Sequence, residues 1–148
     1  MEKTFIMLKP SAVTRGLIGN ILTRLENRGL KIVALKMVQL TAETAAKLYA
    51  VHQGKPFYDS LIAYVTSAPV VALVAEGEDA VKVTRKLVGN TNPKEAEPGT
   101  IRGDLAMITT KNVIHASDSA ENAQNEISIF FKPREITTYN RADENWIY

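Results

Sequence analysis

Hydrophobic positions along the chain follow two spacings, one typical of β-strands and one typical of α-helices. Strands are predicted by the apolar runs at 4–8 and 70–74 and by the alternating segment 30–40. Helices are predicted where apolar residues recur every three or four positions, over about 17–28, 41–51, 58–66, 80–88 and 120–131. A short final strand is expected at 113–114, immediately before the last helix.

The order of these elements indicates the fold class. Strands and helices alternate without repeats, which predicts an α+β layer arrangement with helices mostly on one face of a sheet. A doubly wound parallel sheet is the competing topology. No glycine-rich dinucleotide turn follows the first strand, and no Gly-Lys-Ser/Thr phosphate loop is present. Bound phosphate would therefore have to be held mostly by side chains.

Two segments do not fit this alternation. Residues 90–104 contain two prolines and two glycines among polar residues, which predicts a long functional loop. The tail, residues 132–148, is polar but ends in the aromatic segment 145–148. An exposed terminal Trp146 would be unusual, so we expect the tail to pack against another surface.

Length and composition narrow the class of protein. With 148 residues the chain reads as a single domain, 1–148, large enough to bury its own core. The absence of cysteine excludes disulfides, thiolate zinc sites and a cysteine nucleophile. No apolar stretch approaches the ~20 residues needed to cross a membrane, so a cytoplasmic location is expected. The net charge of +2 gives no indication of nucleic-acid binding.

The segment 112–119 carries the strongest chemical signal. It places the imidazole of His115 among small polar residues before a helix for which Ser119 is the expected N-cap. If Glu126 on that helix takes a hydrogen bond from one ring nitrogen, the other nitrogen keeps a free lone pair. Such a nitrogen can attack phosphorus or bind a metal. From these residues alone a structural histidine remains the alternative.

Side chains suited to phosphate and to a base occur elsewhere in the chain. Lys9, Arg85 and Arg102 offer fixed positive charge. Hydrogen-bonding groups and an aromatic wall are available from Tyr49, Phe57, Thr91 and Asn112. Each of these residues singly is more often a surface or core residue, and only their coincidence with His115 favours a functional site. The other histidine, His52, is read as surface or packing, with no role assigned.

Five segments together resemble the nucleoside diphosphate kinase family. They are Phe5-Ile6-Met7-Leu8-Lys9-Pro10, Thr91-Asn92-Pro93, Pro98-Gly99-Thr100-Ile101-Arg102-Gly103-Asp104, the histidine segment 112–119, and Asn145-Trp146-Ile147-Tyr148. The resemblance extends over essentially the whole chain in order. It implies a ferredoxin-like α+β sandwich, in which helices pack on a four-stranded antiparallel sheet.

The resemblance also implies an activity and a role for each matched residue. His115 takes the γ-phosphoryl group of a nucleoside triphosphate, such as ATP, on Nδ1 and passes it to a nucleoside diphosphate in a ping-pong reaction. Glu126 holds the imidazole and Ser117 lies beside it. Phosphates and sugar are bound by Lys9, Tyr49, Arg85, Thr91, Arg102 and Asn112, and the base stacks on Phe57. Because stacking reads bases weakly, broad base specificity is expected. Mg²⁺ is implied as the cofactor, held by the nucleotide phosphates, with Asp118 reaching it at most through water.

The resemblance further implies a homo-oligomer. The tail is similar to that of hexameric members, in which it packs across a subunit boundary, so a hexamer is expected. Departures from the family pattern are small: Ala116 stands where glycine is common, and Ser11-Ala12 where Asp-Gly is common. Two alternatives stay open, a catalytically idle nucleotide-binding or regulatory module of the same fold, and an RNA-binding domain of similar topology.

Overall fold

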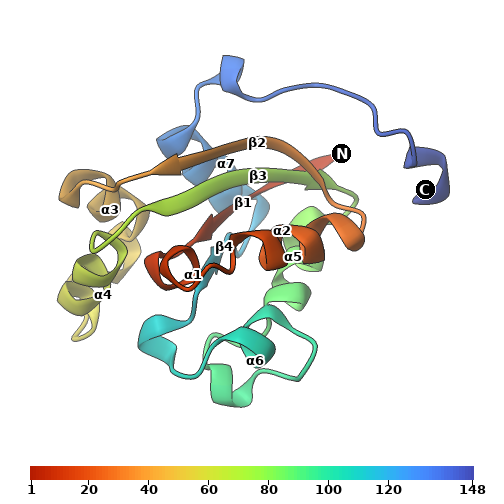
Figure 1. Cartoon of the computed structure of the whole chain (residues 1–148). Coiled ribbons are helices and arrows are strands. Elements are labelled where there is room, and N and C mark those ends of the chain that lie inside the picture. The colour runs from red at the N-terminus through yellow and green to blue at the C-terminus, as the bar shows by residue number, and fades with distance from the viewer.

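The protein is built around one antiparallel sheet, which a computed structural model describes over residues 1–148 (Figure 1). The strands are β1 (Glu2–Leu8), β2 (Lys31–Val38), β3 (Val70–Gly77) and β4 (Ile114–Ala116). They lie in the order β2-β3-β1-β4, and every neighbouring pair is antiparallel. The ferredoxin-like fold is therefore confirmed, and the doubly wound parallel sheet is wrong.

Seven α-helices connect and follow these strands. They are α1 (Pro10–Thr14), α2 (Ile18–Asn27), α3 (Ala42–Leu48), α4 (Tyr58–Val65), α5 (Ala80–Val88), α6 (Ile101–Leu105) and α7 (Ala120–Phe130). Single 3-10 turns lie at η1 (Ala50–His52), η2 (Pro93–Glu95), η3 (Thr109–Lys111), η4 (Pro133–Glu135) and η5 (Glu144–Trp146). None of the helices is long and apolar enough to cross a membrane.

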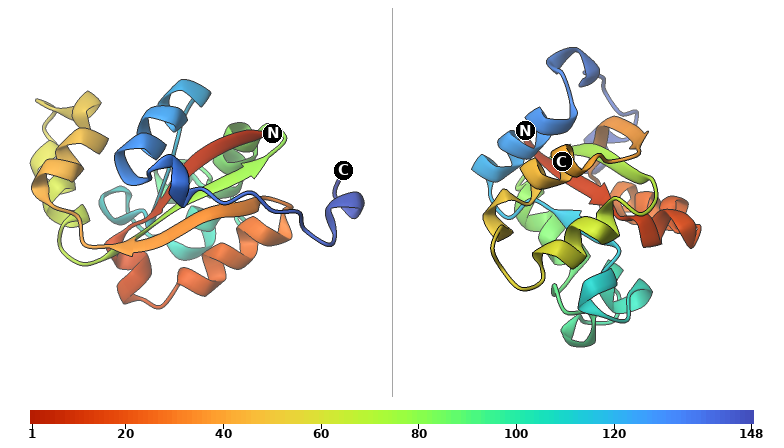
Figure 2. Two further views of the ribbon diagram at one scale, coloured as in Figure 1. Left: turned by 90° about the horizontal axis from the view of Figure 1, so that it is seen from above. Right: turned by 90° about the vertical axis from the view of Figure 1, so that its left-hand side faces the viewer.

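Helices cover both faces of the sheet, so the expectation of helices mostly on one face is wrong. Along β1 the side chains alternate: Ile6 and Leu8 pack into a core with α2 and α5, whereas Phe5 and Met7 pack into a second core with α3, α4 and α7. The strands β1 and β3 are apolar on both faces, so each face needs its own cover. Figure 2, which views the molecule from above and from the left-hand side of Figure 1, shows helices on either side of the sheet.

The first strand ends at Leu8, as predicted, and Pro10 at the first position then begins the short helix α1, which the pattern did not predict. Two other local predictions differ from the structure. The predicted helix 41–51 ends at Leu48 and tightens into the 3-10 turn η1, which is common at helix ends. The predicted loop 90–104 contains α6, whose start is fixed by Thr100, since its hydroxyl accepts from the amide of Gly103.

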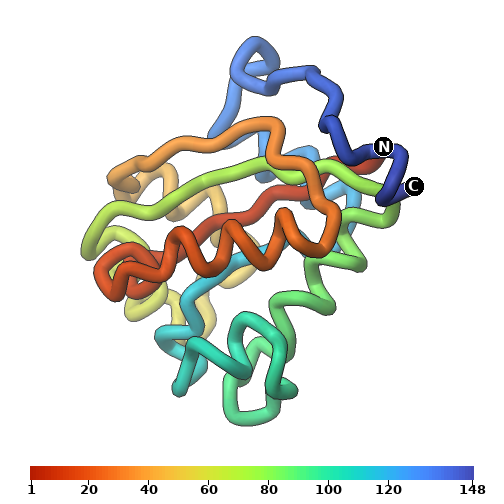
Figure 3. Tube along the Cα trace, turned by 45° about the vertical axis from the view of Figure 1, so that its right-hand side comes forward, coloured from red at the N-terminus to blue at the C-terminus, as the bar shows by residue number.

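The C-terminal tail runs beside the outer edge of β2 and ends near the N-terminus of the chain (Figure 3). The amide of Thr137 donates to the carbonyl of Val33 at 2.8 Å. The hydroxyl of Tyr139 donates to the carbonyl of Ile32 at 2.6 Å. Further along, Arg141 donates to the carbonyl of Leu30. The side chain of Trp146 is nevertheless 91% exposed, so the tail does not bury its largest aromatic residue within this chain.

Candidate active site

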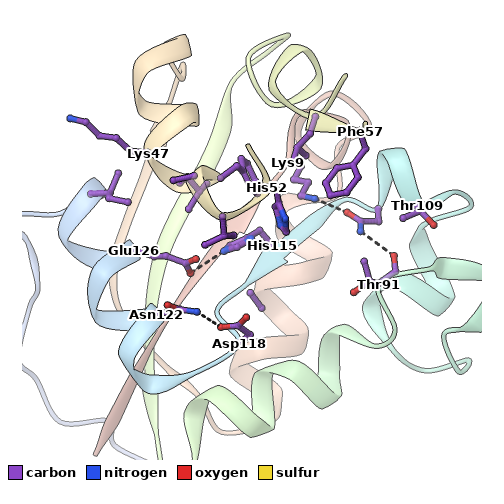
Figure 4. Close-up of a pocket in the computed structure, with 18 of the residues that line it drawn as sticks. Lys9, Lys47, His52, Phe57, Thr91, Thr109, His115, Asp118, Asn122 and Glu126 are labelled. Atoms are coloured by element: carbon purple, nitrogen blue, oxygen red, sulfur yellow. Dashed lines mark hydrogen bonds and ion pairs between the residues drawn. The ribbon is translucent and has the colours of Figure 1, made fainter. Parts of the chain in front are cut away.

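A cavity of about 530 Å³ opens between the α3–α4 hairpin, the strand β4 with α7, and the segment from α5 to η3 (Figure 4). This volume lies in the range of cavities that bind small molecules and cofactors. It brings together nearly all the side chains singled out in the sequence, Lys9, Tyr49, Phe57, Arg85, Thr91, Arg102, Asn112, His115, Asp118 and Glu126. Ser117 lies outside the lining, buried behind Glu126.

The imidazole of His115 is held by one carboxylate. Its Nε2 lies 3.0 Å from Oε1 of Glu126, and because a carboxylate only accepts, Nε2 carries the proton. The hydroxyl of Ser117 donates to the same oxygen at 2.5 Å, which fixes the carboxylate in turn. His115 makes no other side-chain hydrogen bond, so its Nδ1 is free on a ring that lines the cavity.

Local structure explains this alignment. His115 lies in β4 opposite Met7 of β1, so its backbone is fixed by the sheet. Four residues later Ser119 caps α7, as predicted, by accepting from the amide of Asn122. Glu126 then lies about two turns into α7, on the side that packs toward the sheet. Ala116 does not adopt a positive φ, so its departure from glycine brings no backbone strain.

The buried ammonium of Lys9 anchors a chain of hydrogen bonds at the cavity floor. Its Nζ donates to Oδ1 of Asn112 at 2.7 Å, and Nδ2 of Asn112 donates to the carbonyl of Thr91 at 3.1 Å. Burial, together with the neighbouring charge of Arg102, lowers the pKa of Lys9 to about 7. No carboxylate compensates this charge, which an anionic ligand would stabilise.

The two arginines of the cavity differ in their surroundings. Arg102 is buried, and its guanidinium donates to three backbone carbonyls, those of Gly89, Asn112 and Ile114. Burial, and then the charge of Arg85, lowers the pKa of Arg102 to about 10. Arg85 is more exposed and donates once, to the carbonyl of Ala116 at 3.2 Å. Arg102 therefore braces the loops of the site, and Arg85 has more donors free.

The hydroxyl of Tyr49 is buried at the cavity wall without any hydrogen-bond partner. Its ring meets the imidazole of His115 edge-on, with the centroids 5.7 Å apart. Burial, and next the charge of Glu126, raises the pKa of Tyr49, so the phenol stays protonated as a donor. A buried donor without a partner at a cavity is the arrangement expected where a ligand oxygen completes the bonding.

One end of the cavity is marked by a partly exposed aromatic ring. Phe57, 44% exposed, and Thr109 lie at this end, far from Lys47 at the other (Figure 4). Sequence reasoning missed Thr109 and also His52, whose ring packs edge-on against Phe57 with centroids 5.2 Å apart. His52 follows Tyr49 by three residues, a spacing that places two side chains on one side of a helical turn and could have indicated its position.

Metal-binding capacity from protein side chains alone is small. No group of three or more histidine, aspartate, glutamate or cysteine side chains gathers anywhere in the chain. Asp118 is an exposed carboxylate at the cavity that accepts from Asn122 at 2.6 Å. One carboxylate fits a cation held mainly by ligand phosphates, because such ions keep water and phosphate oxygens in their coordination shell.

Comparison with known proteins identifies the family. The sequence profile described as "Nucleoside diphosphate kinase" matches residues 2–136. The chain is 55% identical to a nucleoside diphosphate kinase of Archaeoglobus fulgidus over 148 residues, 100% of this chain and 98% of the relative. It is 54% identical to one of Staphylococcus epidermidis, covering 100% and 99%.

Solved structures agree with these sequence relatives. A halophilic nucleoside diphosphate kinase from Halobacterium salinarum in complex with CDP superimposes with a TM-score of 0.97, at 45% identity over 99% of this chain and 98% of that one. A family protein from Babesia bovis gives a TM-score of 0.96, at 44% identity over 100% of both chains. The chain therefore belongs to the nucleoside diphosphate kinase family, and is a phosphotransferase that acts on nucleotides.

Proposed function

We propose that this kinase works through a phosphohistidine on Nδ1 of His115. The observation that carries the proposal is the juxtaposition of a free imidazole nitrogen with three cations, Lys9, Arg85 and Arg102, that pair with no carboxylate. Cations held without counter-charge beside a nucleophile suit a ligand with several negative oxygens.

The transfer takes place in two half-reactions at the same atoms. Nδ1 of His115 attacks the γ-phosphorus of a nucleoside triphosphate, the N–P bond forms, and the bridging P–O bond breaks to release the diphosphate. The positive charge left on the ring is balanced by Glu126, which holds the proton of Nε2. A terminal oxygen of another nucleoside diphosphate then attacks the phosphorus and frees the imidazole. Ping-pong kinetics follow.

Different residues of the cavity bind different parts of the nucleotide. Lys9, Arg85, Arg102, Thr91 and Asn112 hold phosphate and sugar oxygens, and the unpartnered hydroxyl of Tyr49 donates to one of them. Arginine and lysine here stabilise the charge on the migrating phosphoryl group.

The base stacks on Phe57, which is 44% exposed at one end of the cavity, and stacking alone does not distinguish one base from another. Broad acceptance of purine and pyrimidine nucleotides follows. The Halobacterium relative holds CDP, a pyrimidine nucleotide, which is consistent with such a site.

A divalent metal is general in this family, and we propose Mg²⁺. When bound, it would neutralise charge on the nucleotide phosphates and keep them in a reactive orientation. Asp118, an exposed carboxylate at the cavity, would reach it at most through water. The side chains of this protein would still have to bind the phosphates and hold the imidazole.

We also propose a single domain with a tail, residues 132–148, that lies at a subunit interface of a hexamer. The support is the 91% exposed Trp146 and the edge strand β2, on which Leu35 and Met37 are 50% and 58% exposed. Sedimentation equilibrium tests this; a monomer or tetramer at working concentration would exclude the hexamer. A cytoplasmic location stays a prediction that cell fractionation can check.

The chemistry is tested by labelling. The protein is incubated with γ-labelled ATP and Mg²⁺, and an acid-labile, base-stable label that passes to added GDP is expected. His115→Ala should lose the label, whereas His52→Ala, the other histidine of the chain, should keep it. An unlabelled wild type would favour the idle module, and a label that survives His115→Ala would place the chemistry on another residue.

A further inference from the structure

Val113, two residues before His115, has a backbone conformation that its side chain disfavours. Its φ is +64°, and it is fully buried. Left-handed backbone is rare for residues branched at Cβ, because the side chain crowds the neighbouring carbonyl. Of the residues other than glycine only Val113 and Asp79 have a positive φ, and Asp79 lies in a turn outside the cavity.

The left-handed residue forms a tight turn at the start of β4. The amide of Ile114 donates to the carbonyl of Asn112 at 2.9 Å, a hydrogen bond over three residues centred on Val113. The carbonyl of Val113 accepts from the amide of Lys9 at 2.8 Å, and Arg102 donates to the carbonyls on either side, at Asn112 and Ile114. Residues of the site itself therefore hold the turn in place.

The turn changes which face each side chain occupies. In a regular strand side chains alternate, so residues three apart such as Asn112 and His115 point to opposite faces. Here both line the cavity, whereas the neighbours Val113 and Ile114 both pack into the core formed with α2 and α5. Val113 and Ile114 follow one another in the same core, and their neighbours on either side both line the cavity. This arrangement requires a break in the alternation of side chains, and the break lies at Val113.

We infer that Val113 is a positioning residue for phosphoryl transfer, whose left-handed turn brings the Asn112–Lys9 pair and the His115 imidazole to one wall. This inference rests on the proposed role of His115. The pair binds the phosphate chain and the imidazole attacks it, so their relative placement sets how the phosphorus meets Nδ1. Strained backbone concentrates at sites where geometry of this kind matters.

Two truncations separate this role from ordinary packing. Val113→Ala and Val113→Gly both lose the buried methyl groups, but only glycine adopts a positive φ freely. We measure the single-turnover rate of His115 phosphorylation at saturating ATP, the Kd for ADP, and the midpoint of thermal unfolding. Val113→Ala should phosphorylate about tenfold more slowly with little change in Kd, and Val113→Gly should stay within about threefold of wild type and unfold at a higher temperature than the alanine variant.

Packing alone predicts the reverse order, since glycine removes more contacts. The inference is overturned if Val113→Gly is as slow as or slower than Val113→Ala, or if both equal the wild type. If neither truncation folds, Val113→Asn is compared with Val113→Thr: the first tolerates left-handed backbone and the second is branched at Cβ. A faster Asn variant supports the turn, and a Thr variant at least as fast contradicts it. An unlabelled wild type would instead refute the phosphohistidine itself.

Discussion

Ser117 and His115 share a single oxygen of Glu126, which accepts from the Ser117 hydroxyl at 2.5 Å and lies 3.0 Å from Nε2 of the imidazole. One oxygen thus fixes both the ring orientation and its tautomer. The carboxylate is held in turn by the Ser117 hydroxyl, and its helix, α7, is capped at Ser119. The imidazole is therefore oriented before any ligand binds.

Replacing Glu126 should slow phosphorylation without weakening binding. In Glu126→Gln the side chain keeps its shape but loses the charge that balances the phosphorylated ring. We expect the single-turnover rate to fall roughly 10- to 100-fold, the range seen when metal-bound histidines lose the group that orients them. Rapid-quench labelling measures the rate, and equilibrium titration with ADP measures the affinity. Glu121→Gln, an exposed glutamate on the same helix, is the control and should change neither.

The buried Lys9 predicts a particular dependence of stability on pH. Its pKa is about 7 when folded and 10.5 when unfolded, so between these values the unfolded chain binds more protons. Stability then rises with pH through this window, by at most about 1.4 kcal/mol per pH unit, and the contribution is flat below pH 7. Urea unfolding at several pH values should show this rise in the wild type and its loss in Lys9→Met. Parallel curves for the two proteins would contradict the assigned pKa.

Arg102 and Arg85 should respond differently to lysine. Lysine cannot reproduce the three bonds that Arg102 makes to backbone carbonyls, so Arg102→Lys should lower the free energy of unfolding by roughly 2–4 kcal/mol and slow phosphorylation. Arg85→Lys loses one such bond at a more exposed position and should cost less than about 1 kcal/mol while weakening ATP binding. Equal destabilisation of the two variants would show that Arg102 has no special bracing role.

Removing the aromatic face at position 57 should weaken all nucleotides alike. Base stacking on an aromatic side chain contributes roughly 1–3 kcal/mol, so Phe57→Ala should raise Kd by about 5- to 150-fold. Competition titrations with ADP, GDP, CDP and UDP measure this, and Phe57→Trp should restore affinity. A loss confined to one base would indicate that another group, such as Thr109, reads the base edge.

Much of this fold was predictable because its elements are long and regular. Leu17 to Leu25 repeats at helical spacing, and 70–74 is apolar on every residue, so α2 and β3 follow from the pattern alone. The pattern does not say which face of a sheet each helix covers, because that depends on contacts between distant segments. The short helix α1 begins at Pro10, and α6 begins at Ile101 after its N-cap Thr100. With only five residues each, these helices are too short to show a helical repeat in the sequence.

The site was partly predictable for the same reason. The contact between Glu126 and His115 was predictable, because only the N-cap and the first turns of one helix separate the two residues. Both the cap and the helix can be recognised in the sequence. The placement of Asn112 against His115 was not predictable, since it depends on a positive φ at Val113, a residue type that ordinarily forbids one. His52 was missed because its position depends on where α3 tightens into η1.

The cations of the cavity are more deeply buried than its aromatic side chain, and this difference has a consequence for metabolism. In the proposed binding mode the buried Lys9 and Arg102 would meet the phosphates, and the more exposed Phe57 would meet the base. A site built this way would select its ligand by the phosphate chain and not by the base. Since each cycle breaks and remakes the same kind of phosphoanhydride bond, no nucleotide is energetically favoured, and the direction of transfer is set by concentrations alone. With the broad base specificity proposed above, such a kinase would bring the triphosphate-to-diphosphate ratios of all nucleotides toward one common value.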